Sequence, residues 1–240
     1  MKTKVIIASL VASVPLASHA ATINIDFGRT ISTGNINNVA TADVTAGNTD
    51  SIPDLIDDTG SATGFSFTFA TDDGLGGDDN NVGTYDNTIG NAHTGPYAAS
   101  VTSLLGITDS AILGDGINVI NVNDPLLTLG GLDSSFTYEL RIYNARGAGT
   151  TGAWDYATTD GTGTYNLSDD SILDNDDVIV FSGLTPDING EISTVLSKNG
   201  NARGGINFLQ VVTTPVPEPS AALLLGLGAL IATGRRRRGA

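Results

Sequence analysis

Short segments in which apolar and polar side chains alternate constrain the fold of this chain more than any other feature. Residues 23–27, 65–69 and 136–143 each carry a large apolar side chain at every second position. This period of two is typical of a strand with one buried face. Residues 206–212 are largely apolar on both faces, which indicates a strand near the middle of a sheet. The core elements are therefore expected to be strands.

The residues between these segments are mostly turn formers. Asp, Asn, Gly, Thr and Ser dominate the middle of the chain, and these residues favour turns over helix interiors. We therefore predict an all-β chain that folds as a jelly-roll-like β-sandwich. Within it, residues 178–181 and 191–196 are expected to be partner strands across a turn that contains Pro186.

The first 20 residues have the three parts of a secretory signal peptide. A basic start at residues 1–4 is followed by an apolar run at 5–16 and by the small-x-small sequence Ser18-His19-Ala20. We therefore assign residues 1–20 to the signal peptide and expect the mature chain to begin near Ala21.

Residues 215–240 form a second segment that is expected to lie outside the folded core. Prolines at alternate positions remove backbone donors, and they precede an uncharged apolar run at 221–232. As a helix, residues 220–234 would be about 22 Å long, which is short for a membrane span. The basic end of the segment is expected on the cytoplasmic side of the membrane. A buried helix is the alternative, but it explains neither the prolines nor the basic end, which is formed by Arg235, Arg236, Arg237 and Arg238.

This order of parts resembles the PEP-CTERM sorting signal of Gram-negative bacteria. The resemblance implies that an integral-membrane exosortase recognises Pro217, Glu218 and Pro219 and processes the chain near them. Residues 215–240 would then be the sorting signal, and residues 21–214, about 190 residues, would be one exported domain with its own core. The product is expected to be anchored transiently in the inner membrane and then to reach the cell surface or the extracellular space.

The charge of the expected domain excludes some functions. Between residues 21 and 220 there are five Lys and Arg against 26 Asp and Glu, a formal charge of −21 (five minus 26). Such a chain repels nucleic acid and anionic membrane surfaces. The absence of cysteine excludes thiol chemistry and thiolate metal sites.

No catalytic constellation is visible. His93 is the single histidine after residue 20, and no nucleophile pattern lies near it. A pair of glycosidase carboxylates stays open as an alternative, because Asp is abundant throughout and no pair stands out. We expect a protein that is not an enzyme.

Two acidic loops are candidate calcium sites, because they supply hard oxygen ligands on flexible segments. Neither fits the EF-hand pattern, and solvated acidic loops are the alternative. No other cofactor is expected. The candidate ligands are Asp72, Asp73, Asp78, Asp79, Asp174 and Asp176.

Trp154, Tyr156, Arg141 and Arg146 lie close in sequence at the end of the segment 136–143. Aromatic faces stack on sugar rings and Arg bonds their hydroxyls, so these residues are candidate carbohydrate contacts. The alternative is that Trp154 and Tyr156 are core residues or cover the sheet.

Residues 25–28, 138–143 and 205–209 resemble strands of galactose-binding-like and malectin-like sandwiches. We therefore expect an exported, non-enzymatic envelope or extracellular-matrix protein that binds polysaccharide. A secreted carbohydrate-active enzyme and a purely structural or adhesive protein stay open.

Overall fold

A computed structural model describes ten stretches of the chain and gives their elements. The described residues are 20–28, 32–40, 49–70, 82–85, 99–114, 116–119, 126–144, 153–168, 178–199 and 204–216. The elements in chain order are β1 Thr22–Gly28, β2 Asn37–Ala40, β3 Thr49–Ile52, β4 Ser66–Ala70, β5 Val82–Tyr85, α1 Ala99–Leu105, α2 Ser110–Leu113, β6 Gly116–Val119, β7 Leu126–Gly130, β8 Phe136–Tyr143, β9 Ala153–Thr159, β10 Thr164–Ser168, β11 Val178–Leu184, β12 Ile192–Asn199, β13 Gly204–Ile206 and β14 Phe208–Pro215.

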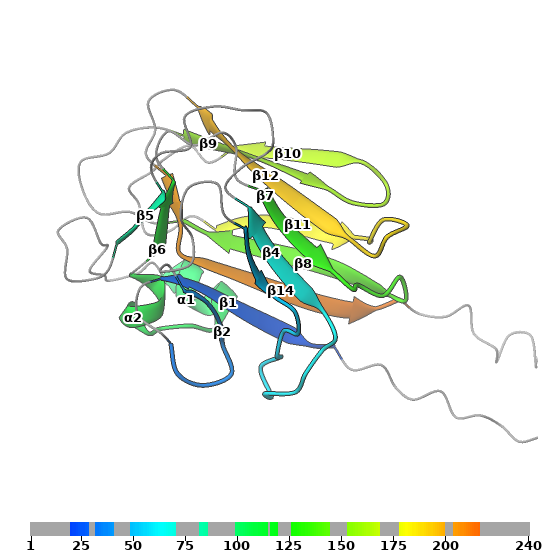
Figure 1. Ribbon diagram of the computed structural model, residues 1–240, viewed down its shortest axis with the longest axis horizontal. Helices are drawn as coiled ribbons and strands as arrows, with labels where there is room; N and C mark the ends of the chain where they lie inside the picture. The colour runs from blue at the N-terminus through cyan, green and yellow to red at the C-terminus, as the bar shows by residue number, and fades with distance from the viewer. Residues whose placement is uncertain are drawn as a thin grey trace, which may run out of the picture.

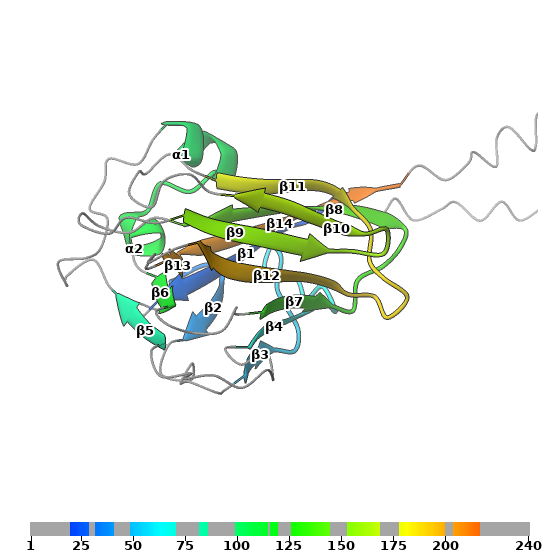
Figure 2. The same cartoon turned by 90° about the horizontal axis from the view of Figure 1, so that it is seen from above.

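Two sheets face each other as the layers of a β-sandwich (Figures 1 and 2). One sheet has the order β11-β8-β14-β1-β2, and the other has the order β10-β9-β12-β7-β4-β3. Neighbouring strands are antiparallel, with the exception of the parallel pair β1 and β2. A small third sheet joins β13, β6 and β5. The predicted all-β sandwich is confirmed.

The core fills the space between the two sheets. Alternate residues of each strand point inward, as the period of two in the sequence requires. The Phe27 ring meets Phe67 and Phe69 of the opposite sheet edge to face, with centroids 5.7 and 6.0 Å apart. The other fully buried aromatic and aliphatic side chains of this core include Ile23, Ile25, Leu55, Tyr138, Ile142, Tyr156 and Val211.

The outer face of the five-stranded sheet is covered at one end by α1 and α2. Tyr143 and Phe208 point outward from β8 and β14 and form a second apolar cluster with Val101, Leu105 and Leu113. This cover explains why β14 is apolar on both faces. The strand occupies the centre of its sheet, between β8 and β1, as the sequence predicted.

The expected pairing of residues 178–181 with 191–196 is wrong. β11 pairs with β8 in one sheet, whereas β12 pairs with β7 and β9 in the other. The connection between them therefore crosses from sheet to sheet at the end of the sandwich. It is held there by the β9–β10 hairpin, because Thr185 N donates to the Asp160 carboxylate at 3.0 Å and Gly161 N donates to Thr185 O at 2.8 Å.

The β7–β8 connection depends on a glycine. Gly131 has φ of 70°, a conformation that side chains with a Cβ rarely adopt. A Cβ at this position would also lie 2.7 Å from Gly64 O. Gly131 thus lets the β3–β4 connection pack closely against the turn that leads into β8.

Both ends of the described chain leave the sandwich on the same side (Figure 1). β1 and β14 are antiparallel neighbours, so the first residues of one lie beside the last residues of the other. Val216 N still donates to Ser135 O at 2.8 Å. Among the described residues, no helix is long and apolar enough to cross a membrane. The expected signal peptide up to residue 19 and the expected span beyond residue 216 lie outside them.

Candidate functional site

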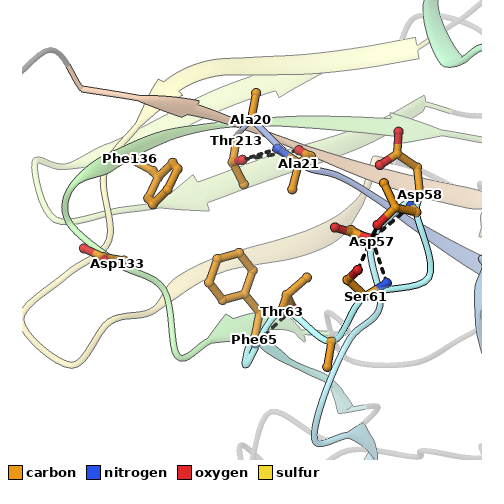
Figure 3. A pocket seen from close by; sticks show the side chains of 12 residues that line it. Ala20, Ala21, Asp57, Asp58, Ser61, Thr63, Phe65, Asp133, Phe136 and Thr213 are labelled. Carbon is orange, nitrogen blue, oxygen red and sulfur yellow. Dashed lines mark hydrogen bonds between the residues drawn. The ribbon is translucent and has the colours of Figure 1, made fainter. Parts of the chain in front are cut away.

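A pocket of about 590 Å³ opens at the end of the sandwich from which both chain ends leave (Figure 3). It lies between the ends of the two sheets, just beyond the buried core. Three parts of the chain form it: the start of β1 with the end of β14, the β3–β4 connection, and the β7–β8 turn. The residues that line it are Ala20, Ala21, Asp57, Asp58, Thr59, Ser61, Ala62, Thr63, Phe65, Asp133, Phe136 and Thr213. We call it the end pocket.

Two phenylalanine rings give the end pocket its apolar walls. Phe65 comes from the six-stranded sheet side and Phe136 from the first residue of β8, and both rings are half-buried. The edge of Phe65 is supported by Tyr138, with ring centroids 6.0 Å apart at 66°. Tyr138 is buried, so its hydroxyl is fixed beneath the pocket.

The Tyr138 hydroxyl in turn holds the β7–β8 turn. It donates to Asp133 O at 3.0 Å and accepts from Asp133 N at 2.8 Å. Burial raises the pKa of Tyr138 to about 12, so the hydroxyl keeps its proton and can both donate and accept a hydrogen bond. The turn that carries Asp133 and Phe136 is therefore a rigid wall of the end pocket.

The carboxylates of the end pocket are held by their own loops. The Asp57 carboxylate accepts from Thr59 Oγ1 at 2.6 Å and from the backbone N–H groups of Thr59 and Ser61, each at 2.9 Å. The Thr59 hydroxyl bond, followed by the Ser61 backbone bond, lowers the pKa of Asp57. The Ser135 N–H bond, at 2.8 Å, lowers the pKa of Asp133. Both groups are therefore ionised at neutral pH.

The polar groups of the end pocket are all acceptors or hydroxyls. Figure 3 shows Asp133 at one end of the pocket and Asp57 and Asp58 at the other, with the two rings between them. No basic side chain is among the described lining residues. Such a set can accept hydrogen bonds from hydroxyl or ammonium groups and pack against the apolar face of a ring.

Arg141 lies elsewhere, on the outer face of the five-stranded sheet. Its Nε donates to Glu139 at 2.6 Å, and its Nη1 donates to Leu104 O at 2.6 Å and to Gln210 Oε1 at 2.9 Å. The guanidinium thus links β8 and β14 to the carbonyl of Leu104 in the last turn of α1. It borders a smaller hollow of about 370 Å³ that Asp58 separates from the end pocket.

Among the described sequence candidates, Tyr156 does not lie beside Arg141 on the outer face of the sheet. Tyr156 is fully buried in the core, where its hydroxyl accepts from Asn144 Nδ2 at 3.1 Å. It therefore takes the core position that the sequence left open as an alternative. Trp154 lies in β9 of the opposite sheet. Arg146 lies outside the described residues.

The candidate calcium ligands, from Asp72 to Asp176, and the lone His93 also lie outside the described residues. Within the described stretches, no group of three or more carboxylate or histidine side chains is arranged to hold a metal ion. Calcium binding stays a prediction from the sequence.

Sequence reasoning missed the residues of the end pocket. The sequence pattern assigns Phe65 and Phe136 to strands. Their position at the start of each strand, next to solvent, was the one signal that could have indicated a pocket. Asp57, Asp58 and Asp133 are ordinary loop acids in a chain rich in them. The β8–β14 pairing places the turn that carries Asp133 near Thr213, and the bond from Asp58 N to Thr22 O ties the β3–β4 connection to β1. No local pattern predicts these contacts.

Residues 215–238 match the PEP-CTERM protein-sorting motif. This confirms that the C-terminal segment is a PEP-CTERM sorting signal. The motif implies a C-terminal membrane anchor and processing by an exosortase. It marks the chain for export, transient anchoring in the membrane, and then the cell surface or the extracellular space.

The described fold is similar to several solved carbohydrate-active proteins. A carbohydrate-binding module, TmCBM61, in complex with β-1,4-galactotriose matches with 12% identity and a TM-score of 0.31, over 54% of this chain and 86% of the module. The C-terminal CBM6 of LamC from Zobellia galactanivorans matches with 13% identity and a TM-score of 0.28, over 55% and 98%. Similarity of this degree says nothing about a ligand. No curated protein matches the sequence.

Proposed function

We propose that this exported chain is a non-enzymatic protein of the cell envelope or extracellular matrix, and that its end pocket binds a neutral polysaccharide. The observation that carries the proposal is the pocket itself. It combines two aromatic walls, Phe65 and Phe136, with carboxylates and hydroxyls on rigid loops. Its volume of about 590 Å³ lies within the range of small-ligand sites.

The lining chemistry suits a sugar. The C–H faces of a pyranose ring are apolar and can pack on Phe65 and Phe136. The ring's hydroxyls are donors that the carboxylates of Asp57, Asp58 and Asp133 can accept. Because the loops are held by their own backbone hydrogen bonds, little ordering is needed when a ligand binds.

The negative charge of the protein favours neutral over acidic polysaccharides as ligands. Residues 21–220 carry a formal charge of −21 (five basic residues minus 26 acidic ones), and no described lining residue of the end pocket is basic. A polymer rich in uronic acids or sulfate would be repelled. A neutral polymer escapes this penalty, so it is the preferred ligand.

The state of the carboxylates favours binding over hydrolysis. A glycosidase needs one carboxyl group whose raised pKa keeps it protonated as a general acid. The pKa values of Asp57 and Asp133 are lowered instead, by the hydrogen bonds of their loops. Ionised acceptors of this kind support sugar hydroxyls without transferring a proton.

The test is to fill the end pocket without removing any of its packing. Ala62 is exposed and lines the pocket, so Ala62→Trp places a large ring in its mouth. Ala99→Trp, on the exposed start of α1, adds the same ring at a distance. The exported protein is run through native gels that contain β-glucan, galactan, mannan, xylan or alginate.

We expect at least one neutral polysaccharide to retard the parent protein and Ala99→Trp, but not Ala62→Trp. Alginate, a polyuronate, should retard none of them. If the parent passes through every neutral gel unretarded, or if Ala62→Trp is retarded like the parent, the proposed function is wrong.

The sorting roles of individual residues are tested separately. We propose that Pro217, Glu218 and Pro219 are the exosortase recognition element and that Arg235 to Arg238 are the cytoplasmic stop. Replacing the three recognition residues by Ala should leave the precursor in the inner membrane. Replacing the four arginines by Ser should let the precursor escape unsorted.

Both variants are followed by fractionation and blotting in a host that carries an exosortase. The two failures are distinguishable, because one accumulates in the membrane and the other leaves it at full length. A Pro-Glu-Pro variant that matures and leaves the membrane like the parent would contradict the recognition role.

A further inference from the structure

The wall of the end pocket contains the point at which the signal peptide is expected to be removed. Ala20, the last residue of the expected signal peptide, and Ala21, the first of the mature chain, both line the pocket. Cleavage between them would remove one lining residue and turn the amide nitrogen of the other into a free amino group. The pocket of the mature protein therefore differs from that of the precursor in one charged group.

The position of that nitrogen is well fixed. Ala21 N donates to Thr213 Oγ1 at 2.7 Å, and Thr213 N donates to Ala21 O at 2.9 Å. The neighbouring residue is held from the other side, because Asp58 N donates to Thr22 O at 2.7 Å. Ala21 is thus clamped between β14 and the loop that carries the pocket's carboxylates (Figure 3).

We propose that the α-ammonium group of Ala21, formed when the signal peptide is removed, is a ligand-binding group of the end pocket and its one described cation. This inference rests on the proposed function and on cleavage after Ala20. An ammonium has three donor hydrogens. Thr213 Oγ1 takes one of them, and the other two are free for a sugar oxygen or a pocket carboxylate.

Three carboxylates are among the described residues that line the end pocket with Ala21. Asp57 and Asp58 on the β3–β4 connection and Asp133 on the β7–β8 turn share its pocket, and Thr213 on β14 does not titrate. The ammonium would add a charged donor to a pocket whose side chains supply carboxylate acceptors and hydroxyls. Ring and glycosidic oxygens of a sugar accept hydrogen bonds, so the mature pocket would recognise both kinds of sugar oxygen.

The experiment moves the amino group without touching the pocket residues. A Gly-Ser-Gly-Ser segment is inserted between Ala20 and Ala21, so that the mature chain carries its charge four residues further out. Mass spectrometry of the exported protein gives the N-terminus of the parent and of this extended variant. A parent that does not begin at Ala21 overturns the proposal at this step.

The direct readout needs no ligand. After residue 20 the chain has one lysine, Lys198, so mass spectrometry can follow the acetylation rate of each amine separately across neutral to alkaline pH. An α-amino group ordinarily has a pKa of about 7.7 to 8.0. Beside carboxylates it should stay charged to about one pH unit higher in the parent than in the extended variant. Asp57→Asn with Asp58→Asn should reduce this difference, and equal profiles in parent and extended variant overturn the proposal.

The ligand readout uses the neutral polysaccharide that binds the parent. We expect the extended variant to bind it about tenfold more weakly, the effect of losing one charged hydrogen bond. Equal affinity would mean that the ammonium does not contact the ligand, which overturns the proposal. If the parent binds no polysaccharide, the proposed function fails, whereas the acetylation profiles still decide whether the ammonium lies among the pocket's carboxylates.

Discussion

Two loops of this protein have the same backbone structure but different surroundings. In the loop at residues 57–61, Asp57 N donates to Ser61 O at 2.9 Å and Gly60 N donates to Asp57 O at 2.9 Å. In the loop at residues 187–191 the equivalent bonds run from Asp187 N to Glu191 O, at 2.9 Å, and from Gly190 N to Asp187 O, at 3.0 Å. Gly60 and Gly190 both have positive φ, 84° and 76°.

The leading aspartate has the same role in both loops. Its Oδ1 accepts the backbone N–H groups two and four residues later: Thr59 and Ser61 for Asp57, and Asn189 and Glu191 for Asp187. The strongest cause differs, the Thr59 hydroxyl in one loop and the Glu191 N–H in the other, but both lower the pKa of the aspartate. A sequence of the type Asp-x-x-Gly-x thus builds one local structure twice.

The surroundings separate the two loops. The loop at 57–61 is bonded to the start of β1 and lines the end pocket. The loop at 187–191 packs on the β7–β8 turn through Leu132 N and Gly190 O, 3.0 Å apart, and its Ile188 is fully exposed. The local signal therefore determines the loop, whereas its neighbours determine whether the loop can contribute to a site.

The largest expected difference between the loops concerns their glycines. A residue with a Cβ in the left-handed region costs about 1–2 kcal/mol. In Gly190→Ala the Cβ would also lie 3.0 Å from Leu132 O, a backbone atom, whereas in Gly60→Ala it meets the Asn35 side chain at 2.8 Å. Because a side chain moves more easily than backbone, we expect Gly190→Ala to lose about 2 kcal/mol and Gly60→Ala about 1 kcal/mol of unfolding free energy.

Urea unfolding of both variants gives these losses. Gly163→Ala is the control, because a Cβ added to Gly163 would have no other atom within 4 Å and the φ of this residue lies outside the left-handed region. It should change the unfolding free energy by less than about 0.5 kcal/mol. A Gly60→Ala loss larger than that of Gly190→Ala would contradict the argument that the Asn35 side chain moves more easily than the Leu132 backbone.

Much of the fold could be predicted from the sequence, because the strands of the core carry their pattern locally. Residues 136–143 coincide with β8, and the apolar residues 206–212 span the end of β13 and most of β14. The pairing of 178–181 with 191–196 could not be predicted correctly, because adjacent strands in the sequence usually form hairpins. Here the two strands lie in different sheets, and the connection between them is bonded to Asp160, which is distant in the sequence.

The site was less predictable for a physical reason. Arg141 was a reasonable candidate by residue type, but its guanidinium is engaged by Glu139, Gln210 and a carbonyl of α1. The end pocket is made instead of residues that look ordinary one at a time. Its carboxylates and its rings meet because β1 and β8 both pair with β14 and because Asp58 N, on the β3–β4 connection, donates to Thr22 O.

A smaller difference between the loops is expected in ligand binding. Asp57→Asn keeps an oxygen for the loop's N–H groups but replaces a charged acceptor in the end pocket by a neutral one. We expect it to weaken binding of a neutral polysaccharide about threefold. Asp187→Asn makes the same change in a loop outside the pocket and should leave affinity unchanged. Affinity electrophoresis compares the two, and an equal effect in both would remove the 57–61 loop from the site.

The smallest expected effect is one that the two loops share, the acid dependence of stability. The folded pKa of each aspartate lies below its unfolded value of about 3.9. Each carboxylate therefore stabilises the fold above that value, and this stabilisation is lost as pH falls through the folded pKa. Asp57→Asn and Asp187→Asn should each be slightly less stable than the parent at neutral pH, and the deficit should disappear in strong acid. Thermal unfolding at both pH values measures it. Because the two aspartates differ in their surroundings and not in their loops, a deficit that persists in acid for one variant alone would show that its substitution disturbs the fold independently of the carboxylate's charge.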